Sequence, residues 1–233
     1  MFEVPLLSRL RQRLTPRQRK HALLGLTAVL VMACTSAVIF HPEEIEDLSE
    51  SNKHELPYLL DQWEDGNVIV LLRHLERCDK EDYPCLQGNE GVTSRSVSVG
   101  HDLAESFNQL GLDNADIYNS PLTRTAQTES IVFDDAGTDK DWLFKCRENM
   151  LEDALKYKAP GKNLILVTHS SCISKFEQAL GYDSERPAYG TSLFFTETAE
   201  PDSLDVLGFL DANDWTVALE ALERKTGATN HPS

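Results

Sequence analysis

After residue 40 the sequence has few basic residues. Six of its 22 lysines and arginines, but only one of its 38 acidic residues, lie within the first forty positions. Residues 41–233 therefore carry 16 basic and 37 acidic side chains, a formal net charge of −21. A surface of that charge repels nucleic acids at long range, so no nucleic-acid partner is expected. An anionic substrate would need a local basic pocket.

The chain also lacks the motifs of several common ligand sites. It contains no glycine-rich nucleotide-binding loop, no internal repeat and no low-complexity tract. No Cys-x-x-Cys or His-x-x-x-His pair occurs, so a zinc site is not expected. The roughly 190 residues after position 40 are enough for one domain with its own core.

Near the N-terminus, residues 22–40 contain no charged side chain and follow a basic stretch, residues 1–21. A mostly apolar run of this length can cross a bilayer, and the basic flank places the preceding end in the cytoplasm. We therefore predict a cytoplasmic N-terminus and an anchor in the inner membrane. A buried core helix fits poorly, because the run is apolar on all sides.

Two cleavage hypotheses compete with a retained anchor. Small residues at 35–37 would suit a signal peptidase, and the preceding residues resemble a lipoprotein processing site that would lipidate Cys34. The apolar residues 38–40 beyond both cuts favour the anchor. Residues 41–56 are acidic and low in hydrophobicity, which predicts a flexible stalk before a folded domain over residues 57–233.

Two apolar runs of similar design predict buried strands. Residues 67–72 and 163–168 are short, rich in branched residues and bounded by polar residues. Each run delivers a histidine, His74 or His169, at its C-terminal end. Further strands are predicted at residues 115–118, 191–196 and 204–210. Strands that alternate with helices indicate an α/β domain with a mainly parallel sheet and helices on both faces.

Both histidines are predicted to have arginine neighbours at the carboxyl edge of the sheet, where ligands of α/β domains bind. Arg73 precedes His74, and Arg124 lies in the first turn of a helix predicted to begin at Ser120-Pro121. Helix N-termini favour anions, and an arginine there adds bidentate contacts to phosphate oxygens. These groups together predict phosphoryl chemistry on a histidine nucleophile.

These motifs resemble those of the histidine phosphatase superfamily, in its phosphoglycerate-mutase-like branch. The superfamily's Arg-His-Gly-Glu motif corresponds to residues 73–76, with Leu75 in place of glycine. Its Ser-x-x-x-Arg-x-x-x-Thr motif corresponds to residues 120–128, and its late strand-end histidine to His169. The leucine leaves the reacting groups intact but is expected to reshape the floor of the pocket.

The resemblance implies roles for the residues that match. His74 would be the nucleophile toward phosphorus, because adjacent cations disfavour protonation of its imidazole. His169 would stabilise charge in the transition state. The phosphate oxygens would be bound by three arginines, Arg73, Arg77 and Arg124. No metal or other cofactor is required by this scheme.

A proton donor for the leaving group is also implied. The superfamily takes this carboxylate from the segment after the third strand, here residues 146–153. Glu148 is the favoured candidate, with Glu152 and Glu76 as alternatives. Such a group needs a raised pKa to remain protonated.

The string RHLERCD at residues 73–79, together with Cys85-Leu86 and Cys172, narrows the resemblance. It is similar to an extracytoplasmic subgroup that includes the bacterial lipopolysaccharide core heptose phosphatase. The implied function is a membrane-anchored or exported phosphomonoesterase in the periplasm, acting on a phosphorylated small molecule or envelope glycan. A phosphoryl-transferring mutase and a phosphate-binding module without turnover are the alternatives.

Four cysteines follow Cys34, and an even number in a segment outside the cytosol predicts two disulfides. Cys78 and Cys85 lie in one loop, where closure is easy, and are expected to pair. A bond from Cys146 to Cys172 would join the segment of the candidate proton donor to the turn after the second histidine. The crossed pairing, or free buried thiols in a cytosolic domain, are the alternatives.

Overall fold

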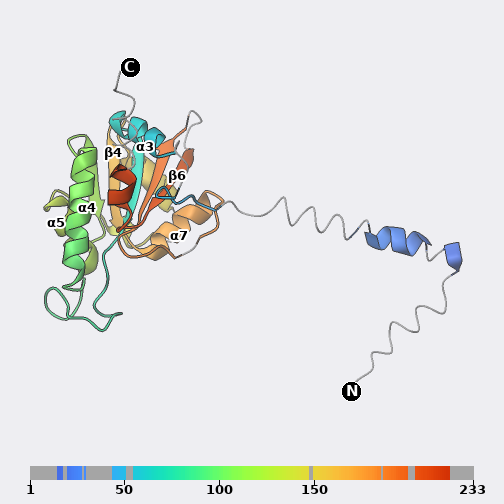
Figure 1. Cartoon of the computed structure of the whole chain (residues 1–233), viewed down its shortest axis with the longest axis horizontal. Helices are drawn as coiled ribbons and strands as arrows, with labels where there is room; N and C mark the ends of the chain where they lie inside the picture. The colour runs from blue at the N-terminus through green and yellow to red at the C-terminus, as the bar shows by residue number, and fades with distance from the viewer. Residues whose placement is uncertain are drawn as a thin grey trace, which may run out of the picture. The chain divides into compact units, whose positions relative to one another are not determined.

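A computed structural model describes residues 15–17, 20–27, 29, 44–50, 55–146, 149–184, 186–198 and 203–220 (Figure 1). The chain divides into two compact units, residues 1–42 and 43–233. In the first unit, residues 20–27 are helical. Among the residues that the structure describes, no helix has the length and apolar character needed to span a bilayer. Most of the predicted anchor, residues 30–40, lies outside the described residues.

The second unit is built on a six-stranded sheet with the strand order β3-β2-β4-β1-β5-β6. The strands are β1 (Val68–Arg73), β2 (Ala115–Asn119), β3 (Thr138–Asp139), β4 (Asn163–Thr168), β5 (Ser192–Glu197) and β6 (Leu204–Leu210). Strands β3, β2, β4 and β1 are parallel, whereas β5 pairs antiparallel with β1, and β6 with β5. The predicted α/β fold with a mainly parallel sheet is confirmed.

Helices cover both faces of this sheet because the strands present apolar residues on both sides. Along β1, Val68, Val70 and Leu72 belong to one core cluster, while Ile69 and Leu71 belong to the other. The first cluster packs under α3 (Glu55–Glu64), α4 (Ser96–Leu110) and α5 (Thr123–Phe133). The second packs under the 3₁₀ helix η1 (Asp141–Leu143), α6 (Met150–Tyr157) and α7 (Ser170–Ala179). Figure 1 shows α4 and α5 side by side, away from α7.

Part of the segment predicted to be a flexible stalk is instead attached to the sheet. Leu48 donates its backbone N–H to Phe209 O of β6 at 2.9 Å, and Phe209 donates back to Glu46 O at 2.9 Å. The side chain of Leu48 is 2% exposed and belongs to the core. Leu48, the partly buried Ile45 and the open edge of β6 outweigh the acidic composition of residues 44–50.

Helix α5 begins two residues later than predicted, at Thr123. Its N-cap position is Leu122, which makes no side-chain capping bond. Ser120, the predicted N-cap, makes a 2.8 Å hydrogen bond with His169 Nε2 instead. Arg124 nevertheless lies in the first turn, as predicted.

Candidate active site

The two predicted histidines lie together at the carboxyl edge of the sheet. Strands β1 and β4 are adjacent and parallel, with Arg73 opposite Thr168, so the residues that follow them are neighbours. The rings of His74 and His169 have centroids 5.4 Å apart in an edge-to-face arrangement. Both side chains are buried.

The hydrogen bonds of His74 define which ring nitrogen is available for chemistry. Its Nδ1 lies 2.7 Å from the carbonyl oxygen of Leu75. A carbonyl can only accept, so Nδ1 carries the proton in this contact. In the neutral ring Nε2 therefore holds the lone pair, and this is the atom that can attack an electrophile.

Burial and nearby cations keep both imidazoles neutral. Burial is the largest cause that lowers the pKa of His74 to about 2. Electrostatic interactions with His169, Arg124 and Arg73 lower it further, and the hydrogen bond to Leu75 opposes them. Burial, and then Arg124 and two further arginines, lower the pKa of His169 to about 3. A nucleophilic histidine is needed in this neutral form at physiological pH.

The guanidinium of Arg73 is fixed by the segment that precedes β5. Its Nη1 donates to Pro187 O, and its Cζ lies 3.9 Å from the ring centroid of Tyr189. The Tyr189 ring also lies 5.8 Å from that of His74. This segment thus positions the arginine beside the candidate nucleophile, and no sequence motif predicted the role of Tyr189.

Three buried nitrogens of the cluster have no hydrogen-bond partner within the described residues: Arg73 Nε, Arg124 Nε and His169 Nδ1. Buried polar groups in proteins nearly always have a partner. A phosphate oxygen would accept hydrogen bonds from the two guanidinium groups. The cluster is therefore suited to hold a tetrahedral anion in front of His74.

The remaining motif residues organise the site from behind. Thr128 Oγ1 accepts a 2.9 Å hydrogen bond from the backbone N–H of Leu75 and donates to Arg124 O at 2.7 Å. Leu75 is 1% exposed and packs in the core, where Gly100 of α4 leaves room for its side chain. The prediction that Leu75 reshapes the pocket floor was wrong, because this side chain points into the core and is not part of the cavity lining.

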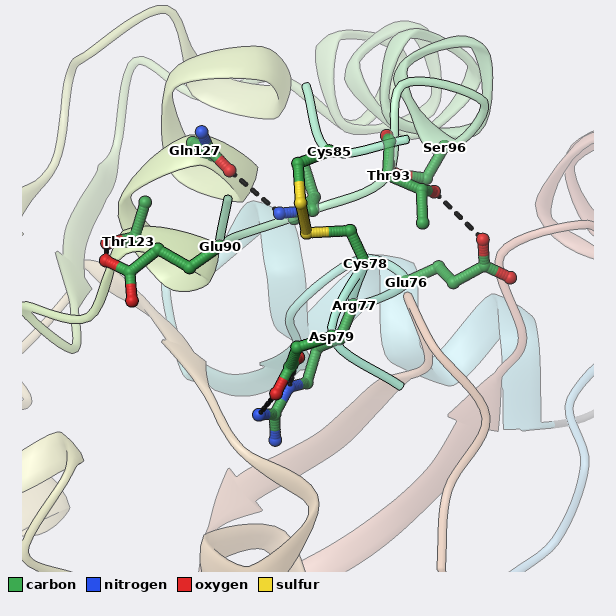
Figure 2. The surroundings of a disulfide bond; sticks show 11 residues. Glu76, Arg77, Cys78, Asp79, Cys85, Glu90, Thr93, Ser96, Thr123 and Gln127 are labelled. Atoms are coloured by element: carbon green, nitrogen blue, oxygen red, sulfur yellow. Dashed lines mark hydrogen bonds and ion pairs between the residues drawn. A yellow bond between two sulfur atoms is a disulfide. The ribbon is translucent and has the colours of Figure 1, made fainter. Parts of the chain in front are cut away.

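The loop that follows His74 is attached to α5 and closed by a disulfide between Cys78 and Cys85 (Figure 2). Gln127 Oε1 accepts a 2.8 Å hydrogen bond from the backbone of Val92, and Thr123 donates to Glu90 at 2.7 Å. The loop is therefore joined to the same helix that carries Arg124.

Within this loop Arg77 forms a bidentate ion pair with Asp79, as Figure 2 shows. Arg77 also lines the cavity in front of the histidines. The positive charge of Arg77 is thus already paired with a carboxylate, which distinguishes it from Arg73 and Arg124. The structure brings all three predicted arginines to one site.

The second predicted disulfide, between Cys146 and Cys172, is also present. It joins the segment after η1 to the first turn of α7. Cys146 lines the cavity, and Phe144 lies edge-on to His169 with ring centroids 5.9 Å apart. The disulfide therefore holds Cys146, the first residue of the segment predicted to carry the proton donor, against α7 beside the cavity.

The structure describes two of the three candidate proton donors. Glu148 lies outside the described residues. Glu152 is exposed on α6 and does not line the cavity. Glu76 accepts hydrogen bonds from Arg95 and Thr93, and these contacts, with Arg95 the larger cause, lower its pKa. A carboxyl with a lowered pKa is a poor proton donor, so the structure gives Glu76 no support in that role.

The site opens into a cavity of about 980 Å³. Its described lining residues are His74, Arg77, Arg124, Phe144, Lys145, Cys146, His169, Ser170, Ser171, Ser174, Lys175 and Arg186. None of these is acidic, although acidic residues outnumber basic ones by more than two to one after residue 40. The cavity is thus the local basic pocket that the overall charge requires for an anionic ligand.

A buried carboxyl on α7, Glu177, is not part of this cavity. It is 6% exposed, and its Oε2 has no hydrogen-bond partner within the described residues. Burial raises the pKa of Glu177 to about 7. A carboxyl whose pKa is higher in the folded state stabilises the fold at low pH, and this contribution is lost as the pH rises through 7.

We therefore expect Glu177→Gln to be more favourable at pH 8 than at pH 5. Glutamine cannot ionise, so the variant avoids the cost of burying a carboxylate at high pH. The change in unfolding free energy on substitution should be about 2 kcal/mol more favourable at pH 8. Urea unfolding of both proteins at the two pH values measures it. The same change at both pH values would contradict the expectation.

Comparison with known proteins supports the fold. No protein-family model matches the sequence. The solved structure of the protein histidine phosphatase SixA with tungstate aligns with a TM-score of 0.51 at 13% identity, covering 63% of this chain and 98% of that one. The domain thus shares the fold of this histidine phosphatase.

Sequence relatives point the same way. The lipopolysaccharide core heptose(II)-phosphate phosphatase of Escherichia coli O1:K1 is 31% identical over 110 residues, which cover 46% of this chain and 54% of that protein. The protein of the same name from Escherichia coli O139:H28 is 34% identical over 113 residues, with the same coverage. The chain spans about half the length of the curated relatives it matches. The chain is thus similar to histidine phosphatases in sequence over about half its length, and in fold.

Proposed function

We propose that the chain is a phosphomonoesterase that acts through a phosphohistidine on His74. The observation that carries the proposal is a buried, neutral imidazole whose Nε2 holds a lone pair, beside His169 and the guanidinium groups of Arg73 and Arg124. Positioning and charge stabilisation supply most of the catalysis of phosphoryl transfer, and this cluster provides both.

The proposed reaction has two steps. In the first, His74 Nε2 forms a bond to phosphorus while the ester P–O bond breaks, and a carboxylic acid protonates the leaving oxygen. In the second, the same carboxylate takes a proton from water as the water oxygen attacks phosphorus, and the P–N bond breaks to release phosphate and the neutral imidazole. Arg73, Arg124 and His169 stabilise the charge on the equatorial oxygens. We assign the proton donor to Glu148, since Cys146 lines the cavity two residues earlier.

A phosphorylated envelope glycan is the substrate that we propose. The curated relatives are named for a heptose phosphate of the lipopolysaccharide core. The cavity is far larger than a phosphate ion needs and lies at the upper end of the range for small-molecule sites, so a sugar can enter with its phosphate.

We propose that the domain works in the periplasm, attached to the inner membrane by residues 22–40. Two disulfides support an oxidising compartment. The described helical residues Leu23, Leu24 and Leu26 are more than 60% exposed, as lipid-facing side chains would be. A C-terminal reporter that is active only outside the cytosol should give a signal. Signal only from a cytosolic reporter would refute this orientation.

Hydrolysis of 4-nitrophenyl phosphate by the full-length protein tests the activity. We expect turnover on the order of 1–10³ s⁻¹, the usual range for enzymes, and the same rate with a chelator present. Binding of phosphate without release of nitrophenol would indicate a binding module. Transfer to an added sugar hydroxyl, with no inorganic phosphate formed, would indicate a mutase.

A further inference from the structure

The cavity in front of the histidines carries more positive charge than one phosphate ester needs. Besides Arg77 and Arg124, three cationic side chains line its wall: Lys145, Lys175 and Arg186. These five basic residues are drawn from the 16 that residues 41–233 contain. Such a concentration of cations in one cavity of an acidic domain favours a ligand with several negative charges.

The deep part of the cavity can neutralise a phosphate ester without these three side chains. Arg124 and the buried Arg73 face the histidines and together supply two positive charges. A phosphate monoester carries a charge of about −1.5 to −2 near pH 7. Lys145, Lys175 and Arg186, called here the outer cations, are therefore available to bind another part of the substrate.

The outer cations make only weak contacts with other described side chains. Lys145 lies 3.4 Å from Asp141, with both side chains more than 70% exposed, and such pairs contribute little. Lys175 donates to the neutral Gln178 at 3.2 Å. Arg186 has no acidic partner in the described part of the chain. None of the three has to give up a strong ion pair to bind a ligand.

The three cations come from two parts of the fold that line the same cavity. Lys175 lies on α7, together with Ser170, Ser171 and Ser174, and Lys145 precedes the cysteine that is bonded to α7. Arg186 comes from the segment that holds Arg73, and its charge, after burial as the largest cause, helps to lower the pKa of that arginine. The outer wall thus combines three cations with three hydroxyl groups.

We infer that the substrate carries a second anionic group beside the phosphate that is hydrolysed, and that Lys145, Lys175 and Arg186 bind this group. The three serine hydroxyls suit the hydroxyl groups of the scaffold that joins the two anions. A second phosphate and a carboxylate would both satisfy the three cations. The inference rests on the proposed phosphatase function and narrows its substrates to phosphorylated sugars with a further acidic group.

Three substrates with one carbon framework test this inference. Glucose 6-phosphate has one anionic group, glucose 1,6-bisphosphate adds a phosphate, and 6-phosphogluconate adds a carboxylate. We expect kcat/KM to be about tenfold higher for at least one of the two doubly anionic esters, since each exposed charge pair contributes up to about fivefold. The preference should shrink as salt rises, because the contacts are exposed. Which ester is preferred distinguishes phosphate from carboxylate.

Matched variants identify the residues responsible. The triple variant Lys145→Gln, Lys175→Gln, Arg186→Gln should lose most of the preference, and Lys175→Gln alone should lose part of it. Lys156→Gln removes the same charge from the exposed face of α6, outside the cavity, and should keep the full preference. Equal kcat/KM for the three esters, or a preference that survives in the triple variant, would overturn the inference.

A binding measurement separates failure of this inference from failure of the proposed function. Calorimetry with the His74→Ala protein compares the affinities of the same three compounds without turnover. Tighter binding of a doubly anionic ester, lost in the triple variant, supports the outer site even if no ester is hydrolysed. Equal affinities overturn the inference even if hydrolysis is fast.

Discussion

Replacing His74 with alanine is expected to abolish hydrolysis of phosphomonoesters while leaving the binding of phosphate analogues largely in place. Removal of an enzyme's nucleophile lowers kcat by as much as about 10⁶-fold. Arg73, Arg124 and His169 remain in the variant. Vanadate should therefore still compete with a labelled phosphomonoester for the site, and its affinity for the variant should be within about tenfold of its affinity for the original protein.

A second histidine serves as the control for this variant. His101 is exposed on α4 and does not line the cavity. His101→Ala should keep both turnover and vanadate affinity. Turnover by His74→Ala within tenfold of the original would mean that another group attacks phosphorus. Loss of both turnover and vanadate binding, in a variant that still unfolds cooperatively, would mean that His74 mainly binds the anion.

Arg124→Ala is expected to weaken both binding and turnover, in contrast to the histidine variant. The guanidinium lies in the first turn of α5, and its charge reaches both histidines, since it helps to lower the pKa of each. Loss of one such charge-stabilising group typically costs about 10²- to 10³-fold in rate. Steady-state kinetics with 4-nitrophenyl phosphate should therefore show a lower kcat and a higher KM.

The variant Arg124→Lys separates charge from geometry. Lysine restores the positive charge but cannot form two parallel hydrogen bonds to one phosphate. We expect its kcat/KM to lie between those of Arg124→Ala and the original protein. A loss below tenfold in Arg124→Ala would contradict the assignment of Arg124 to the phosphate. Full activity of Arg124→Lys would show that the bidentate contact is dispensable.

The parts of the fold that depend on local pattern could be predicted from the sequence. Strands β1 and β4 are apolar at every interior position because helices cover both sides of the sheet, and that pattern is visible without a structure. The proximity of His74 and His169 could be predicted as well, because neighbouring parallel strands end at the same edge of the sheet. The motif over residues 120–128 placed Arg124 in a first helical turn for the same local reasons.

Features that depend on tertiary contacts could not be predicted in the same way. Ser120 has the residue type of a helix cap, yet its hydroxyl is used by His169, which lies 49 positions away in the chain. The acidic residues around Leu48 suggested a stalk. The sequence does not show that the edge of β6 is open and can pair with this segment. Leu75 was expected in the pocket, and only the space left by Gly100 shows why it packs in the core. Tyr189 carried no sequence signal at all.

The central claim is that His74 carries the phosphoryl group during turnover. Rapid quench of the full-length protein with a ³²P-labelled phosphomonoester, followed by peptide mapping, tests it most directly. We predict an acid-labile, base-stable label on the peptide that contains His74, and no label in the His74→Ala variant. Label on a serine, or on the peptide that contains His169, would contradict the claim.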